Sequence, residues 1–217
     1  MFKARGLLIS LEGIDGCGKS TQAEVLRGKL AEKDIDYTTV REPGGTVVGE
    51  NIRQVLLDNR YSPSLQAEMF LYMAARSELT EQVIRPALLE GSIVICDRFT
   101  DSTLAYQGYG GGADLGLIRL LNRKATGGIA PDLTILFDLS VEEAAGRRGA
   151  KADRMESKDI RFHQRVRCGY LEIAHREAHR VVVVDAAASI EDQSKVVWQL
   201  VQELTARKLS VRSAYEF

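Results

Sequence analysis

The chain has 217 residues and a formal net charge of −1, which fit one α/β domain and exclude general affinity for nucleic acid or anionic membranes. No apolar run reaches the roughly 18–20 residues of a membrane span, and residues 1–6 are too short and polar for a signal peptide. Cys17, Cys96 and Cys168 are an odd, scattered set, which predicts free thiols and a cytoplasmic location.

The first predicted strand, Leu7–Leu11, leads directly into a glycine-rich segment. Residues 13–20 read Gly-Ile-Asp-Gly-Cys-Gly-Lys-Ser and match the phosphate-loop pattern G-x-x-x-x-G-K-[ST]. The following segment, Thr21–Lys33, places its apolar side chains on one helical face. Strand, loop and helix therefore occur in the order that this motif requires, and they predict a site for nucleotide phosphates.

Each part of this loop has a chemical role toward a nucleoside triphosphate. Its glycines allow backbone N–H groups to turn inward around phosphate oxygens. Lys19 can then reach the terminal phosphates, and the Ser20 hydroxyl can coordinate Mg²⁺. The expected nucleotide-binding residues here are Gly13, Ile14, Asp15, Gly16, Cys17, Gly18, Lys19, Ser20 and Thr21.

Short apolar strands alternate with longer helical patterns along the rest of the chain. This alternation predicts a three-layer α/β fold of the P-loop NTPase type, with five parallel strands between helices. No linker or repeat interrupts the pattern, so residues 1–217 are expected to form a single domain. Further strands are predicted at Tyr37–Val40, Ile93–Cys96, Leu133–Phe137 and Val181–Val184, and helices at Val48–Asp58, Leu65–Glu90, Asp114–Lys124, Asp159–Arg176 and Ile190–Lys208.

Polar clusters follow the second and third predicted strands. Ligands of parallel sheets gather at the carboxyl ends of strands. There the chain carries Arg41-Glu42-Pro43-Gly44-Gly45-Thr46 and Asp97-Arg98-Phe99. Asp97 can hold magnesium or its water shell, and the planar fork of Arg98 suits a phosphate. A structural Asp–Arg surface pair is the alternative interpretation.

Five blocks of sequence, taken together, resemble the thymidylate kinases (dTMP kinases). A phosphate loop alone is shared by many kinases, whereas the five blocks in this order are specific to that family. The blocks are Glu12–Thr21, Arg41–Thr46, Ala74-Ala75-Arg76, Asp97-Arg98-Phe99 with Ser102 and Ala105-Tyr106-Gln107-Gly108, and Asp153-Arg154-Met155-Glu156 with the segment after it.

The resemblance implies transfer of a phosphoryl group from ATP to dTMP in the presence of Mg²⁺, giving ADP and dTDP. Lys19 and Ser20 would hold the ATP phosphates and Mg²⁺, and Asp15 would accept a hydrogen bond from the sugar 3′-hydroxyl. Arg98 would contact the acceptor phosphate. The residues implied to bind dTMP are Asp15, Pro43, Arg53, Tyr72, Arg76, Arg98, Ser102, Thr103, Tyr106 and Gln107.

The resemblance also implies how the base and sugar are recognised. Arg76 would donate to a thymine carbonyl, and Thr103 would read the thymine edge. Tyr72 occupies the base-stacking position, which is usually Phe in the family, and its ring keeps the flat apolar face. Tyr106 would lie near the 2′-carbon, where a ribose hydroxyl would be crowded out.

A short lid is expected at about residues 146–157, and it is implied to supply the catalytic cation. Gly16 stands where some family members carry an arginine in the phosphate loop. Arg147 is expected to lie over the adenine. Arg148 and Arg154 are the candidates for the cation, and Arg154 is preferred because Asp153 and Glu156 beside it can orient its side chain.

Three expectations remain open at this stage. The family implies a homodimer, with Leu65–Leu89 as the interface, although a buried core helix is the alternative. The segment Gly108–Gly112 is expected to be a mobile loop. Two other functions remain as alternatives. The chain could be a P-loop kinase for another small molecule, which Arg76 argues against, or a nucleotide-dependent switch. The chain lacks the N-K-x-D motif of a GTP switch.

Overall fold

The structure, a computed structural model, describes residues 5–147 and 152–214, with side chains as far as Lys208. Its strands are β1 (Leu7–Glu12), β2 (Tyr37–Arg41), β3 (Ile93–Asp97), β4 (Leu133–Asp138) and β5 (Val181–Asp185). Its helical segments are α1 (Lys19–Glu32), α2 (Val47–Leu57), α3 (Leu65–Leu79), η1 (Thr80–Ile84), α4 (Arg85–Leu89), α5 (Thr100–Thr103), η2 (Leu104–Gly110), α6 (Leu115–Ala125), α7 (Val141–Arg147), α8 (Ile160–Arg176) and α9 (Ile190–Ala214).

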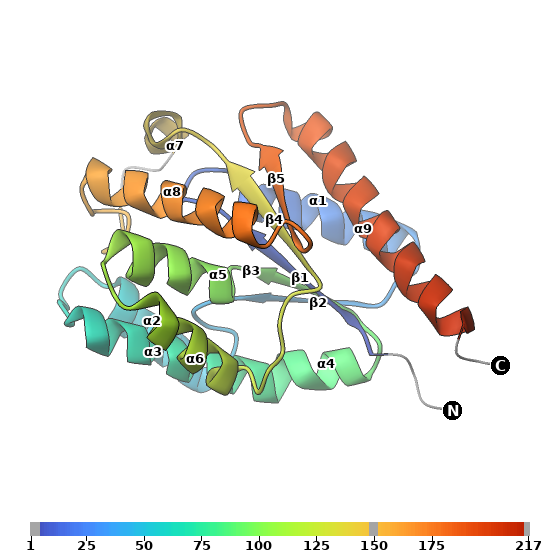
Figure 1. Ribbon diagram of the computed structural model, residues 1–217, viewed down its shortest axis with the longest axis horizontal. Helices are drawn as coiled ribbons and strands as arrows, with labels where there is room; N and C mark the ends of the chain where they lie inside the picture. Colours follow the sequence, from blue (N-terminus) through green and yellow to red (C-terminus); the bar gives the residue numbers. More distant parts are fainter. Residues whose placement is uncertain (1–4, 148–151, 215–217) are drawn as a thin grey trace.

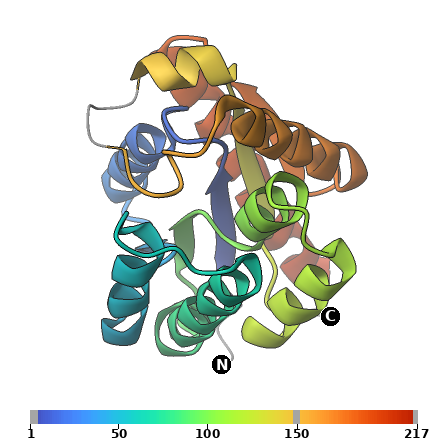
Figure 2. The same ribbon diagram turned by 90° about the vertical axis from the view of Figure 1, so that its left-hand side faces the viewer.

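The five strands form one parallel sheet in the order β2-β3-β1-β4-β5. Helices α1 and α9 lie together on one face, and α8, η2 and the helices from α3 to α6 lie on the other (Figures 1 and 2). Because β1 pairs with both β3 and β4, the strand order reverses beside it, and a crevice is expected at its carboxyl end. None of the helices in the described ranges combines the length and hydropathy of a membrane span.

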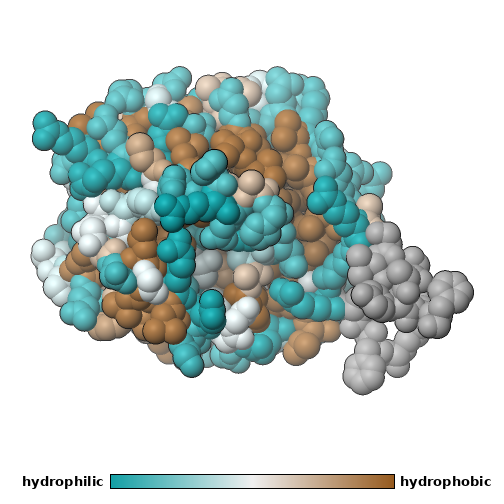
Figure 3. All heavy atoms as spheres, viewed as in Figure 1, coloured by the Kyte–Doolittle hydropathy of each residue, from teal (hydrophilic) through white to brown (hydrophobic). Residues whose placement is uncertain are grey.

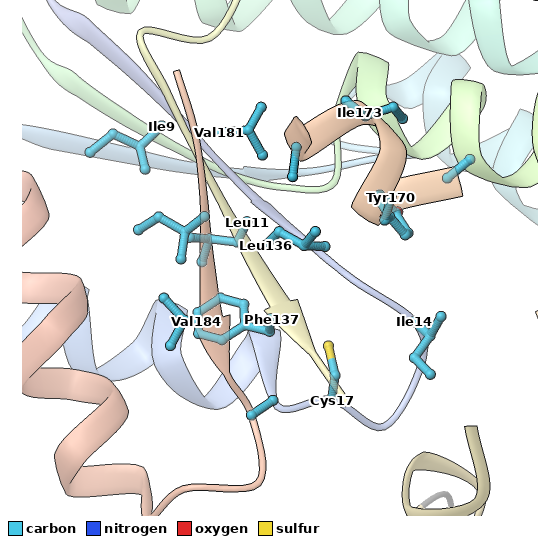
Figure 4. Close-up of a cluster of buried hydrophobic side chains, with 14 of the residues drawn as sticks. Ile9, Leu11, Ile14, Cys17, Leu136, Phe137, Tyr170, Ile173, Val181 and Val184 are labelled. Carbon is cyan, nitrogen blue, oxygen red and sulfur yellow. The ribbon is translucent and has the colours of Figure 1, made fainter. Parts of the chain in front are cut away.

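The central strand β1 is buried along its whole length. A parallel strand covered on both faces is mostly apolar, and Ser10 and Glu12 are the two polar residues buried in β1. Figure 4 shows Leu11 and Phe137 in the core beside the phosphate loop, with the side chain of Cys17 among the apolar groups. The loop therefore rests on a packed hydrophobic floor, in which each large buried side chain contributes about 1.5–3 kcal/mol.

All five predicted strands are confirmed, and each extends one residue further at its carboxyl end. The helix predicted over Leu65–Glu90 differs in its middle, where the π-helical segment η1 divides α3 from α4. The N–H of Arg85 reaches back to Thr80 O, and Pro86 has no N–H to continue an α-helical ladder. Helices α5 and α7 were not predicted.

The expectation of a loop at Gly108–Gly112 is wrong for its first half, because η2 continues to Gly110. The glycines are required by packing. A Cβ atom on Gly108 would lie 2.4 Å from the Leu115 side chain, and one on Gly110 would lie 2.7 Å from Val166. Glycine content predicted a turn, whereas here it lets η2 approach α6 and α8 closely.

Candidate active site

The phosphate loop joins the carboxyl end of β1 to the amino end of α1. Gly13 has a φ of 139°, and a Cβ atom there would lie 2.5 Å from Phe137 O. Gly18 caps α1 in the left-handed region. The Lys19 ammonium donates to Gly13 O and Ile14 O, both at 3.1 Å. This lysine is therefore held inside the curve of the loop, where a phosphate would lie.

A pair of oxygen ligands stands beside the loop. The Ser20 hydroxyl, at the start of α1, donates to Asp97 Oδ2 at the end of β3 over 2.9 Å. Hydroxyl and carboxylate oxygens suit Mg²⁺, which in kinases takes its other ligands from phosphates and water. No cluster of three or more acidic, His or Cys side chains suited to a metal occurs in the described part of the chain. The pair thus fits a magnesium ion that arrives with a nucleotide.

A cavity of about 900 Å³ opens over the phosphate loop. The Arg147 guanidinium at the end of α7 donates to Ala186 O at 3.0 Å, which holds it on the cavity wall. The loop after β5 and the start of α9 complete this wall, and the sequence offered no signal for their role beyond their place after a strand. These additional lining residues are Ala188, Ser189, Ile190 and Gln193.

A second, smaller cavity of about 90 Å³ adjoins the first. Every residue implied by the family resemblance to bind dTMP lines it, from Asp15 and Pro43 to Gln107. Glu42, Leu57, Asp153 and Met155 also line it and were not anticipated. The two cavities share the side chains of Asp15, Glu42, Arg53, Arg98 and Asp153.

Arg98 stands at this junction in a dense hydrogen-bond network. Burial raises the pKa of Asp15, but the opposing charges of Arg98 and Lys19 hold it below its usual range, so the ion pair is charged at neutral pH. Tyr170, from α8, was not assigned a role from the sequence. The guanidinium of Arg98 donates to Gly13 O at 2.9 Å, to the hydroxyls of Ser102, Tyr170 and Tyr106 at 3.1–3.2 Å, and to Asp15.

Arg76, on α3, is only 1% exposed at the floor of the smaller cavity. Its charge is paired with Glu42, which follows β2 and precedes Pro43. Each remaining N–H of the guanidinium also has an acceptor in the protein, so the side chain is fixed in orientation, and the expected donation to a thymine carbonyl would require one of these hydrogen bonds to be exchanged. The further acceptors are Thr103 Oγ1 and Phe99 O, both at 3.0 Å, and Asn122 Oδ1 at 2.5 Å.

Other predicted groups are also fixed by neighbours. Arg53 donates to Pro43 O at 2.9 Å, and Gln107 donates to Glu68 Oε1 at 2.8 Å. The Tyr72 ring lines the smaller cavity, and burial raises the pKa of its hydroxyl above the ordinary range. These side chains are thus presented to the cavity in set positions.

The lid places Arg154 differently from the expectation. Its guanidinium lies 2.6 Å from Glu68 of α3 and donates to Leu56 O, and it lines neither cavity. The expectation that Asp153 and Glu156 orient it is wrong, because both carboxylates accept backbone N–H groups of the lid itself. The other candidate, Arg148, lies outside the described residues. Figure 2 shows the described residues before α8, from Ala152 onward, passing beside the end of α2.

A phosphate loop beside a hydroxyl–carboxylate pair, joined to a second cavity lined by arginines, defines a P-loop kinase that acts on a small phosphorylated acceptor. Residues 11–197 match the thymidylate kinase family model. The thymidylate kinase of Symbiobacterium thermophilum is 48% identical over 205 residues, covering 93% of this chain and 95% of that one. The thymidylate kinase of an Exiguobacterium species is 50% identical, covering 86% and 89%.

Solved structures agree with this result. The crystal structure of thymidylate kinase from Ehrlichia chaffeensis superposes with a TM-score of 0.75 at 34% identity, covering 91% of this chain and 99% of that one. The chain belongs to the thymidylate kinase family, whose reaction is the ATP-dependent phosphorylation of dTMP to dTDP.

Proposed function

We propose that the chain binds ATP in the larger cavity and dTMP in the smaller one, and that the phosphoryl group passes between them at Arg98. The observation that carries this assignment is that Asp15 and Arg98 line both cavities. Phosphoryl transfer requires two anions to be held in line with their charge neutralised. A cation fixed at the junction of two anion-binding cavities meets that requirement.

Each charged group has a separate part in this proposal. Lys19 binds the β- and γ-phosphates, and Arg98 binds the acceptor phosphate and brings it toward the γ-phosphate. Asp15 fixes Arg98 and accepts the 3′-hydroxyl of the sugar. Ser20, with Asp97 acting directly or through water, would hold Mg²⁺, which neutralises charge on the nucleotide phosphates when bound.

The acceptor preference follows from hydrogen-bond polarity. The Thr103 hydroxyl accepts from Arg76, so its own hydrogen is left to donate. A donor in this position matches a thymine carbonyl and opposes the amino group of cytosine. The ring of Tyr106, which lies under the Arg98 guanidinium with 5.0 Å from ring centroid to Cζ, fills the space beside the sugar and disfavours a 2′-hydroxyl.

A coupled ADP-release assay with ATP, Mg²⁺ and a panel of nucleoside monophosphates tests the proposal. We expect kcat/KM to be highest for dTMP, lower for dUMP and UMP, and lowest for CMP. Equal use of CMP would contradict the assignment of the Thr103 hydroxyl, oriented by Arg76, as the donor to thymine, and it would favour a general nucleotide kinase.

We also infer that the chain is a single domain and that two copies form a homodimer in the cytoplasm. The exposed face of α3 would be the interface between them. The three cysteines are free thiols, as a reducing compartment requires. Phe70 of α3 is 48% exposed, and Leu65 at the start of α3 and Val48 of α2 are also exposed. Figure 3 shows further exposed apolar side chains over α6, where Leu117 and Leu120 lie.

Light scattering of the purified chain tests the oligomeric state. We expect a dimer mass for the wild type and a monomer for Phe70→Arg. The matched control is Ile160→Arg, which alters an exposed apolar residue on α8 and should leave the dimer intact. A monomeric wild type would contradict the inference.

A further inference from the structure

Glu12 is a buried carboxylate at the last position of β1, and the mechanism above gives it no part. It is 0% exposed, which is costly for a charged group unless donors surround it. Oε1 accepts from Ser10 Oγ at 2.8 Å and from the Phe99 N–H at 2.7 Å. Oε2 accepts from Ser102 Oγ at 2.6 Å and from the Tyr170 hydroxyl at 3.0 Å. Burial and the nearby charge of Asp101 raise the pKa of this carboxyl, and the hydrogen bonds from Ser102 and Ser10 and the charge of Arg98 act against that effect.

Three of these four donors are connected to Arg98. The Phe99 N–H follows it in the chain, and the hydroxyls of Ser102 and Tyr170 accept from its guanidinium. Its backbone adopts a φ of 71°, in the left-handed region that a residue with a Cβ atom rarely occupies. The next N–H in the chain, that of Phe99, is the one that Glu12 accepts. Glu12 therefore fixes the backbone turn that points Arg98 into the junction of the cavities.

The other link runs through the side chain of Arg98. The hydroxyls of Ser102 and Tyr170 lie 2.6 and 3.0 Å from Glu12 Oε2 and 2.8 Å from each other, and both accept from Arg98 Nη1, at 3.2 and 3.1 Å. Each hydroxyl has one hydrogen, which is donated either to Glu12 or to the other hydroxyl that donates to Glu12, so both keep lone pairs for the guanidinium. The carboxylate thus sets the polarity of both hydroxyls in the direction that Arg98 needs.

We propose that Glu12 is the positioning residue of Arg98, holding both its backbone turn and its guanidinium ready for the acceptor phosphate. The inference rests on the proposed role of Arg98 toward dTMP. A guanidinium oriented in advance binds a phosphate without paying to order its own side chain. The effect of Glu12 must therefore depend on the phosphate of the acceptor and not on its base or sugar.

The test compares dTMP with thymidine, which lacks the phosphate, by calorimetric binding to Glu12→Gln. The amide has the shape of the carboxylate, but its nitrogen cannot accept the donors that Glu12 accepts. We expect dTMP affinity and kcat/KM to fall about 10- to 100-fold, as for the loss of hydrogen bonds to a charged group. Thymidine and ATP affinities should stay within about twofold. Equal losses for thymidine and dTMP, or an unchanged dTMP affinity, would overturn the proposal.

Two further variants keep the test independent of folding. Ser10→Ala removes a buried donor to Glu12 that does not contact Arg98, and it should bind dTMP like the wild type. Tyr170→Phe removes one bridge and leaves Glu12 in place, so dTMP affinity should fall about 3- to 10-fold with thymidine affinity unchanged. If Glu12→Gln does not fold, this second variant decides, and a loss shared by both ligands would refute the inference. A wild type that binds thymidine but does not phosphorylate dTMP would instead refute the proposed function.

Discussion

Replacing Arg154 with alanine separates two roles that the lid arginine can have. Its guanidinium is paired with Glu68 at 2.6 Å, and the two side chains are 10% and 7% exposed. Removing one partner of such a pair leaves a buried charge without compensation, which costs about 3 kcal/mol at the lower end of the usual range. For a chain of this size the loss corresponds to a fall in melting temperature of roughly 6–12 °C.

Catalysis adds a second, separable expectation. If Arg154 leaves Glu68 during turnover and neutralises the transferring phosphoryl group, its loss should lower kcat about 10²- to 10⁴-fold with little change in KM for dTMP. Glu68→Gln provides the matched variant, because it breaks the ion pair, keeps an acceptor for Gln107, and leaves the cation in the lid.

Thermal unfolding and steady-state kinetics of both variants test this reasoning. We expect both to lose stability, and only Arg154→Ala to lose kcat, with Glu68→Gln within about threefold of the wild type. If Glu68→Gln loses as much kcat as Arg154→Ala, the arginine acts only by anchoring the lid to α3. The catalytic assignment of Arg154 would then be refuted, and Arg148 would be the remaining candidate.

Three further predictions address other groups of the site. Lys19→Ala should abolish ADP release in the coupled assay while the far-ultraviolet circular dichroism stays that of the wild type, because alanine offers no ammonium to neutralise charge at the phosphates. Tyr72→Ala should weaken dTMP binding by roughly 1–3 kcal/mol in calorimetry while Tyr72→Phe stays near wild type, since the ring face stacks on the base. Asp15→Asn should weaken the fall in the free energy of unfolding at acid pH, as measured by urea unfolding at a series of pH values. Arg98 and Lys19, against burial, hold the pKa of Asp15 below its unfolded value of about 4, so its contribution is present above that pH and lost below it.

The sequence predicted the sheet well because strands depend on local signals, and the family resemblance predicted the residues that line the small cavity. Apolar runs mark the strands, and the residue after each run marks the functional edge of the sheet. Arg98 follows β3 directly, so its place at the junction could be foreseen. Resemblance to a family supplied the residues on helices, such as Tyr72, whose cavity-facing position has no local signature.

The partners of the arginines could not be predicted because they come from distant parts of the chain. Arg154 pairs with Glu68, 86 positions earlier, although acidic residues stand beside it in sequence. Those neighbours are used by the lid backbone. Likewise, the glycines of η2 wrongly predicted a loop. Glycine is required both in tight turns and where a helix packs closely against another, and here it allows η2 to pack against α8.

Two arginines that line the smaller cavity and one in the lid each have their own carboxylate: Arg98 with Asp15, Arg76 with Glu42, and Arg154 with Glu68. Buried pairs of this kind are weak contributors to stability, since well-packed apolar groups of equal volume often do as well. Their shared value is orientation, because a guanidinium held by a carboxylate has a fixed direction for its remaining donors. For an enzyme whose chemistry consists mainly of placing two phosphates in line, fixed cation directions matter more than fold stability. The reaction therefore explains why these charges are buried at a cost in stability. Apolar side chains in place of the arginine–carboxylate pairs could preserve the fold, but the site would be lost.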